Sequence, residues 1–233
     1  MYSEKFKIFI DTWEKEFGIA RTLEEQISID RDGNPIPWYT YPAIEYLTQF
    51  DYADRQIFEF GCGNSSKFWA ARAGSVVSVE DNPQWFARWQ RELTAPNQRV
   101  LLRSKDETYE NAVLENNTQY DVIIIDGKRR AQCCRTALQR LAPGGIIILD
   151  DSDRVNTSDE YRQAIKTLCA AGLLQVDFYG FCPMNSRAKA TSLFFSRNFN
   201  FQSRFPVQPI NGIGNLWSMS RRQRKEFINK YQK

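Results

Sequence analysis

Residues 56–69, with the sequence QIFEFGCGNSSKFW, decide the fold. The stretch opens with the apolar run 57–60, which is too short for a helix and therefore indicates a buried strand. Gly61 and Gly63 follow at once, and the apolar spacing of Phe68 and Trp69 then predicts a helix. Glycines in such a turn let the backbone pass close to a ligand, which faces the free N–H groups at the helix start. An ordinary strand-to-helix connection has the same pattern, so both interpretations stay open at this point.

The next predicted strand, residues 75–79, ends in the acidic pair Glu80 and Asp81. Glu80 lies about twenty residues beyond the glycines, the spacing at which an acidic side chain accepts hydrogen bonds from ribose hydroxyls in nucleotide-binding βαβ units. A dinucleotide fingerprint would have a third glycine three residues after Gly63, where this chain has Ser66. The more open turn favours a nucleoside without phosphates as the ligand.

The remaining pattern predicts alternating helices and strands. Apolar residues at helical spacing predict a helix over residues 3–17 and another over residues 83–93, with Trp85 and Trp89 among its inward-facing residues. The last two β-rich runs suit an antiparallel pair at a sheet edge. The predicted strands after the first are 75–79, 99–103, 120–125, 146–149, 173–181 and 190–196.

Four motifs follow one another at characteristic spacing: EFGCG at residues 59–63, the acidic Glu80, YDVIIIDG at 120–127 and LAPGGIIILDDS at 141–152. In this order the sequence resembles the class I S-adenosylmethionine-dependent methyltransferases over residues 56–197. The resemblance implies an α/β fold of the Rossmann-like, doubly wound type, with a mostly parallel seven-stranded sheet and an antiparallel C-terminal edge pair. It also implies S-adenosyl-L-methionine as the cofactor and a transferase activity (EC 2.1.1.-).

We expect three parts along the chain. Residues 1–55 form an N-terminal helix and an aromatic cap segment, residues 56–197 the methyltransferase domain, and residues 198–233 a basic C-terminal extension. One domain with appendages fits the length of 233 residues.

The cap segment contains an aromatic loop with Trp38, Tyr39 and Tyr41. In the family that the sequence resembles, the segment before the first strand commonly helps to cover the cofactor and the substrate. These side chains are therefore candidate substrate contacts. The alternative, which we favour for at least one of them, is that they pack the N-terminal helix onto the domain.

The composition limits the classes of function. The chain has no histidine, which excludes histidine acid–base catalysis and histidine metal ligands. Its five cysteines show no metal-ligand spacing and are odd in number, which favours reduced thiols in a cytoplasmic protein. No apolar run approaches the length of a membrane span, and the N-terminus lacks the order of a signal peptide, so we expect no membrane association.

Charge is distributed unevenly. Residues 197–233 carry eight Lys or Arg and one Asp or Glu, whereas residues 56–196 carry 17 and 16. The near-neutral middle argues against a nucleic-acid groove, and the basic tail is most simply a solvated helix face that could contact an anionic partner. We expect a small-molecule substrate rather than nucleic acid, and the sequence leaves a homo-oligomer open.

The resemblance assigns candidate cofactor contacts to the glycine turn and to the ends of the second, third and fourth strands. Asp106 is the candidate partner of the adenine amine, because the family often has a polar or acidic residue near that point. The full set is Glu59, Gly61, Gly63, Asn64, Ser65, Glu80, Asp81, Asp106 and Asp126.

Acidic residues end three of the predicted strands at the carboxyl edge of the sheet, where open α/β sheets form their crevice. Carboxylates that lie close together raise one another's pKa unless a cation lies among them. That cation could be the sulfonium of the cofactor, a metal ion, or a side chain just after the fourth strand. The acidic ends are Glu80, Asp126, Asp150 and Asp151, and the nearby basic residues are Lys128, Arg129 and Arg130.

Asp126, Asp150 and Asp151 resemble in position the metal-binding aspartates of catechol-type and bacterial cation-dependent O-methyltransferases. Oxygen ligands suit Mg²⁺, which would lower the pKa of a hydroxyl nucleophile. The chain departs from those families: catechol-type enzymes usually have Asp-Asn at 150–151, and many bacterial relatives have a histidine at position 129. The three aspartates are therefore candidate metal ligands, and Asp126 and Lys128 are candidate catalytic residues, with Arg129 as an alternative to Lys128. A purely structural role for the aspartates, as caps and backbone acceptors, is the other interpretation.

We expect in-line transfer of a methyl group to an oxygen of a small molecule. Two other classes stay open. An NAD- or nucleotide-binding Rossmann oxidoreductase would share the glycine turn and Glu80, and a methyltransferase-like module could bind its ligand without catalysis.

Overall fold

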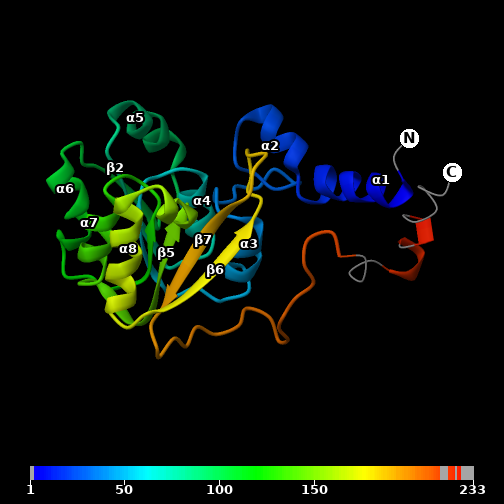
Figure 1. Ribbon diagram of the computed structural model, residues 1–233. Coiled ribbons are helices and arrows are strands. Elements are labelled where there is room, and N and C mark those ends of the chain that lie inside the picture. Colours follow the sequence, from blue (N-terminus) through cyan, green and yellow to red (C-terminus); the bar gives the residue numbers. More distant parts are fainter. Residues whose placement is uncertain (1–2, 216–219, 224, 227–233) are drawn as a thin grey trace.

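The computed structural model describes residues 3–215, 220–223 and 225–226 (Figure 1). Its centre is a seven-stranded sheet in the order β3-β2-β1-β4-β5-β7-β6. The first five strands are parallel, and β7 runs antiparallel to both β5 and β6. The predicted mostly parallel sheet with an antiparallel edge pair is confirmed. The strands are β1 Gln56–Phe60, β2 Ser75–Glu80, β3 Gln98–Leu102, β4 Tyr120–Ile125, β5 Leu141–Asp150, β6 Leu174–Gly180 and β7 Lys189–Phe195.

Helices cover both faces of this sheet (Figure 1). Three precede the first strand, and the others connect successive strands. The α-helices are α1 Glu4–Asp11, α2 Ile19–Glu25, α3 Tyr41–Leu47, α4 Asn64–Ala70, α5 Pro83–Glu92, α6 Asp106–Glu110, α7 Arg130–Ala137 and α8 Asp159–Ala170. Three shorter turns are the π-helical η1 Thr12–Glu16 and the 3₁₀ turns η2 Ala112–Leu114 and η3 Ser152–Asn156.

The sheet separates two hydrophobic cores, because successive side chains of a strand point to opposite faces. In β1, Ile57 packs with α3 and α4, whereas Phe58 packs with α7 and α8 on the other face. Both side chains are fully buried, as is the apolar run of β4. Burial on both faces is what the unbroken apolar runs of parallel strands predict.

The N-terminal segment begins as predicted, with the Ser3 hydroxyl accepting a hydrogen bond from the N–H of Phe6 at 3.3 Å. The segment is attached to the domain through aromatic side chains. Trp13 makes edge contacts with the rings of Tyr41 and Phe181 at centroid separations of 5.7 and 5.1 Å. Helix α1 itself extends away from the sheet (Figure 1).

After β7 the chain runs back along α3. The N–H of Asp51 donates to the carbonyl of Gln202 at 2.9 Å, and Phe201 is buried in the core on that side. The predicted basic helix is described only at residues 220–223 and 225–226, and Lys230 lies outside the described residues. The three-part division of the chain stays a prediction. Within the described ranges, no helix is long and apolar enough to cross a membrane.

The antiparallel direction of β7 has a consequence for the site. The parallel strands β1, β2, β4 and β5 end at one edge of the sheet, and β7 starts at that same edge. Asp150, the last residue of β5, pairs with Thr191 near the start of β7. The side chain of Lys189 is therefore brought to the acidic strand ends.

Candidate active site

A cleft of about 740 Å³ opens at the carboxyl edge of the sheet. Its walls come from the glycine turn, the ends of β2, β4 and β5, the start of β7 and the N-terminal aromatic loop. The lining residues are Trp38, Glu59, Gly61, Cys62, Ser65, Glu80, Asp81, Asn82, Trp85, Asp126, Gly127, Lys128, Arg130, Asp150, Asp151, Arg154, Asn185 and Lys189.

The two glycines of the turn have different physical roles. Gly61 has a φ of +100°, and a Cβ there would lie 3.3 Å from the carbonyl oxygen of Asp126. Glycine is needed at this position because the left-handed backbone and the neighbouring end of β4 both disfavour a side chain. Gly63 has extended backbone with a φ of 173°, and a Cβ would meet only the ring of Trp89 at 3.9 Å.

Glu59 holds the glycine turn in place through hydrogen bonds. Its carboxylate is buried and accepts hydrogen bonds from the hydroxyls of Ser65, Ser66 and Ser78. Burial raises the pKa of Glu59, and the three hydroxyl donors oppose that rise. Both carboxylate oxygens are already engaged, so Glu59 and Ser65 shape the turn as well as line the cleft.

Glu80 is held rigidly at the end of β2. One carboxylate oxygen accepts the N–H groups of Asp81 at 3.0 Å and Asn82 at 2.9 Å, and the other accepts the thiol of Cys62 at 3.6 Å. Asn82 in turn caps α5. Burial raises the pKa of Glu80. The side chain is thus positioned at the cleft, where its predicted contact with ribose hydroxyls can form.

Three predicted cofactor residues, Gly63, Asn64 and Asp106, lie outside the cleft lining, and Gly63 lines the same adjoining cavity as Asn64. Asp106 begins α6, and its side chain is 56% exposed and paired with Lys128 at 2.9 Å. Asn64 lines an adjoining cavity of about 150 Å³, where its amide donates to the carbonyl of Ser28 at 2.6 Å. Their assignment as cofactor contacts stays a prediction.

Lys128, the predicted catalytic lysine, lies between two carboxylates. Its ammonium is 3.0 Å from Asp81 and 2.9 Å from Asp106. The hydrogen bond that the ammonium donates to Asp106 raises the pKa of Lys128, so this group is a cation rather than a base. Its alternative, Arg129, pairs with Glu110 at 2.8 Å.

The three aspartates Asp126, Asp150 and Asp151, which we call the acidic cluster, are brought together as predicted. One carboxylate oxygen of each lies within 4.8 Å of the others. The buried guanidinium of Arg130 lies against them, with Nη2 at 3.1 Å from Asp126 and 3.5 Å from Asp151. It also donates to the backbone carbonyls of Gly127, at 2.9 Å, and Asp150.

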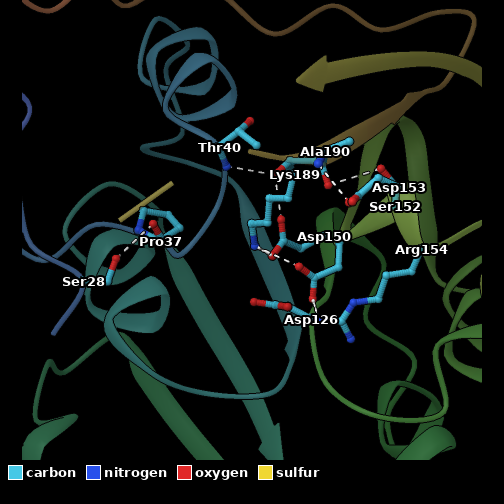
Figure 2. A network of polar contacts seen from close by, with 12 residues as sticks. Ser28, Pro37, Thr40, Asp126, Asp150, Ser152, Asp153, Arg154, Lys189 and Ala190 are labelled. Carbon is cyan, nitrogen blue, oxygen red and sulfur yellow. Dashed lines mark hydrogen bonds and ion pairs between the residues drawn. The ribbon is translucent and has the colours of Figure 1, made fainter. Parts of the chain in front are cut away.

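Lys189 supplies a second cation that the sequence analysis does not identify. Its ammonium donates to a carboxylate oxygen of Asp150 and, at 3.1 Å, to Asp151 (Figure 2). Its side chain is only 11% exposed, and the ring of Trp38 lies 5.9 Å from its nitrogen. Thr191, on the same face of β7, donates to the other oxygen of Asp150 at 2.6 Å.

Residues 58–152 match the family model of a methyltransferase domain. The chain has the fold of the class I methyltransferases. The sheet order, with its antiparallel β7, is that of this fold, and solved methyltransferases resemble it over most of their length. A putative O-methyltransferase from Klebsiella pneumoniae shares 23% identity at a TM-score of 0.54, covering 76% of this chain and 89% of that one.

Two further solved structures show the same likeness. The O-methyltransferase TomG from Streptomyces achromogenes, in complex with S-adenosylmethionine, shares 14% identity at a TM-score of 0.54, covering 84% of this chain and 99% of that one. A precorrin-6y C5,15-methyltransferase from Geobacter metallireducens shares 13% identity at a TM-score of 0.52, covering 74% and 96%. No curated protein matches the sequence significantly. At these identities the likeness shows the fold alone.

The pKa values within the cleft follow from burial and from these charges. Burial and the neighbouring Asp150 raise the pKa of Asp126 to about 7, although Arg130 and Lys189 oppose the rise. Burial also raises the pKa of Asp150. For Asp151, Lys189 and two arginines outweigh the effect of burial, so its pKa is lowered.

The acidic cluster, as it is arranged, does not fit a divalent cation. Three carboxylates at this separation are a suitable donor set for Mg²⁺. However, the ammonium of Lys189 and the guanidinium of Arg130 already bind the oxygens that a metal would use. The prediction of Mg²⁺ therefore finds no support in the structure.

Some aromatic residues around the cleft are buried in the core, and others form part of the cleft wall. Tyr39 and Tyr41 are buried, which agrees with packing of the N-terminal segment, whereas Trp38 is 45% exposed and lines the cleft. Trp89 is buried as predicted. Trp85 is not, being 41% exposed, because its indole N–H reaches the carbonyl of Cys62 at 2.8 Å. The inward prediction for Trp85 is wrong, and it forms part of the cleft wall instead.

Proposed function

We propose that this domain transfers a methyl group from S-adenosylmethionine to an oxygen atom of a small molecule. The observation that carries the proposal is the composition of one continuous cleft. The glycine turn and Glu80 line it together with Asp126 and the rest of the acidic cluster. A cofactor and an acceptor can therefore lie side by side, as an in-line displacement requires.

The glycine turn and Glu80 suit the cofactor. The Glu80 carboxylate oxygen that accepts only the Cys62 thiol can accept a hydrogen bond from the ribose, and the close approach of Gly61 to β4 leaves an open backbone surface at the cleft. When bound, the cofactor supplies a sulfonium whose methyl group is open to attack. The Streptomyces achromogenes relative by fold was solved with this cofactor.

Asp126 suits the role of the proton acceptor for an acceptor hydroxyl. One of its oxygens is hydrogen-bonded to Arg130, and among the described residues the other has no hydrogen-bond donor. Its pKa of about 7 matches the pH at which an efficient general base works. In the proposed step the hydroxyl proton moves to Asp126, the oxygen forms a bond to the methyl carbon, and the carbon–sulfur bond breaks. The products are a methyl ether and S-adenosylhomocysteine.

A charged cleft wall favours a polar acceptor. The end of the cleft near Asp126 presents Lys189, Arg130 and Arg154 beside the carboxylates, and Trp38 is its exposed aromatic side chain. A small molecule with a hydroxyl group and further polar substituents is the substrate class that fits. An aromatic ring in that molecule could stack on Trp38.

The test is calorimetry of the wild-type protein and of Glu80→Gln with S-adenosylmethionine. The glutamine keeps an acceptor for the N–H groups of Asp81 and Asn82, so the turn stays intact, but its NH₂ group cannot accept from ribose. We expect the dissociation constant to rise roughly 10- to 100-fold, which corresponds to about 1–3 kcal/mol of lost hydrogen bonding.

Lys166→Ala, on the exposed face of α8, is the matched control and should bind as the wild type does. Binding of NAD⁺ in place of S-adenosylmethionine would instead favour the oxidoreductase class. Cofactor binding without methyl transfer to any hydroxyl compound would leave a binding module as the function.

A further inference from the structure

We propose that Lys189 replaces the divalent cation that cation-dependent O-methyltransferases bind at this place: its ammonium balances the acidic cluster and offers an N–H group to the acceptor oxygen. The role of the N–H group towards the acceptor rests on the proposed function, whereas the balance of charge in the acidic cluster does not. Lys189 would then be a built-in counterpart of a metal ion, fixed by the chain instead of taken from solution.

The position of the ammonium supports this role. Lys189 donates to Asp150 and Asp151, two of the three carboxylates whose oxygens lie within 4.8 Å of one another. A Mg²⁺ ion would need oxygens of this cluster at about 2.0–2.1 Å. An ion at that distance would lie next to a buried ammonium, so the lysine and a metal compete for one place.

Charge balance points the same way. The acidic cluster contributes three potential negative charges, and Lys189, Arg130 and Arg154 all pair with it directly. Lys189 and Arg130 have side chains that are 11% and 8% exposed, so water screens these charges little. With its carboxylates compensated in this way, the cluster has little remaining attraction for a further cation.

The direction of β7 explains why a lysine can take this place. Lys189 is the first residue of β7, and Thr191, two residues on, donates to Asp150 from the same face. Of the three N–H groups of the ammonium, two are used by Asp150 and Asp151. Lys189 also lines the cleft, so the third can reach an oxygen of a bound acceptor.

Manganese binding tests the replacement directly. Lys189→Ala removes the ammonium and leaves the acidic cluster with only its arginines, so the variant should bind Mn²⁺ at least tenfold more tightly than the wild type, with a dissociation constant below roughly 1 mM. Electron paramagnetic resonance of free Mn²⁺ measures this without any substrate. Lys166→Ala and Lys189→Arg should behave as the wild type, because both keep a cation in the cluster.

A second variant locates the new metal site. Adding Asp151→Asn to Lys189→Ala removes one ligand and should weaken Mn²⁺ binding again by about tenfold. If Lys189→Ala folds poorly because its carboxylates are uncompensated, Mn²⁺ should raise its melting temperature and leave that of the wild type unchanged.

Two results would overturn the proposal: wild-type protein that binds Mn²⁺ as tightly as Lys189→Ala, or a Lys189→Ala variant that neither binds Mn²⁺ nor is stabilised by it. Neither measurement depends on methyl transfer, so failure of the proposed function would leave them unaffected. Once an acceptor is known, EDTA should not change the wild-type rate, and Mg²⁺ should restore part of the rate lost in Lys189→Ala.

Discussion

Asp126 accepts fewer hydrogen bonds than the other two aspartates of the acidic cluster. Asp150 and Asp151 each accept donors on both carboxylate oxygens, whereas Asp126 accepts Arg130 on one. A carboxylate with an open oxygen and a pKa of about 7 is suited to exchanging protons near neutral pH. The other two are suited to holding cations.

The pH dependence of methyl transfer should report this difference. Only the ionised form of Asp126 accepts a proton, so kcat/KM of the wild type should rise as the pH passes through about 7. Asp126→Asn should lower kcat/KM by roughly 10²- to 10⁴-fold and abolish that inflection. A variant that keeps both the rate and the inflection would show that another group is the base.

Unfolding of the same two proteins provides a control that needs no substrate. The pKa of Asp126 is raised in the folded state, so its protonation stabilises the fold fully below the unfolded pKa, near 4, and this contribution is lost as the pH rises towards 7. Relative to Asp126→Asn, the wild type should lose about 2 kcal/mol of unfolding free energy between pH 5 and 7. The side chain is 26% exposed, so solvent screening keeps this loss below the full linkage value.

Among the secondary-structure elements, the turn between β1 and α4 places the strictest demand on its residues. Gly61 has a left-handed φ of +100° and lies against the backbone of Asp126, whereas Gly63 has extended backbone, and a Cβ there would make only an ordinary contact with the ring of Trp89. The turn therefore fixes the distance between β1 and the end of β4. A change there should alter stability as well as ligand binding.

Gly61→Val should destabilise the protein by at least about 2 kcal/mol, because a β-branched residue is strained at positive φ and its side chain meets the β4 backbone. Gly63→Ala is the matched control, and its melting temperature should stay close to that of the wild type. Denaturant unfolding of both variants measures the difference. Equal destabilisation of the two would contradict the distinct roles assigned here.

Some features of the helices, strands and site can be predicted from the sequence, and others cannot. Strands β1 and β4 are predictable because short, largely apolar runs bounded by glycines or polar residues have few other structures. The acidic cluster is predictable because parallel strands end at a common edge. Lys189 is not, since its place depends on the antiparallel pairing of β7 with β5, which no local pattern near residue 189 specifies. The exposed face of Trp85 likewise depends on a partner distant in sequence, the carbonyl of Cys62.

At the scale of the whole molecule, the segment after β7 has two parts. The first packs against the domain, and the second carries most of the basic residues. Phe199 and Phe201 pack against Phe50 at ring separations of 5.4 and 6.4 Å, and Arg204 donates its N–H to the carbonyl of Gln49 at 2.8 Å. Most of the basic residues come later, from position 221 onwards. The two parts should respond differently to truncation.

Truncation after residue 215 should leave the melting temperature and the affinity for S-adenosylmethionine unchanged, because it removes the basic residues and none of these aromatic contacts. Truncation after residue 197 should lower the free energy of unfolding by at least about 3 kcal/mol, since it removes Phe199 and the buried Phe201. Strong, salt-sensitive binding of RNA or DNA by the full chain, lost in the shorter truncation, would contradict the small-molecule substrate.

The late position of Lys189 along the chain bears on how the protein is made. A ribosome synthesises β1, β4 and β5 well before it reaches β7, so the acidic cluster exists for some time without its lysine. Until then only Arg130 and Arg154 compensate the buried carboxylates, and Asp150 has no cation of its own. An incompletely compensated group of buried carboxylates is destabilising, which disfavours closure of this end of the sheet until residue 189 has left the exit tunnel. The nascent domain is thus expected to complete its fold late, and stalled chains that end before β7 should be sensitive to proteases.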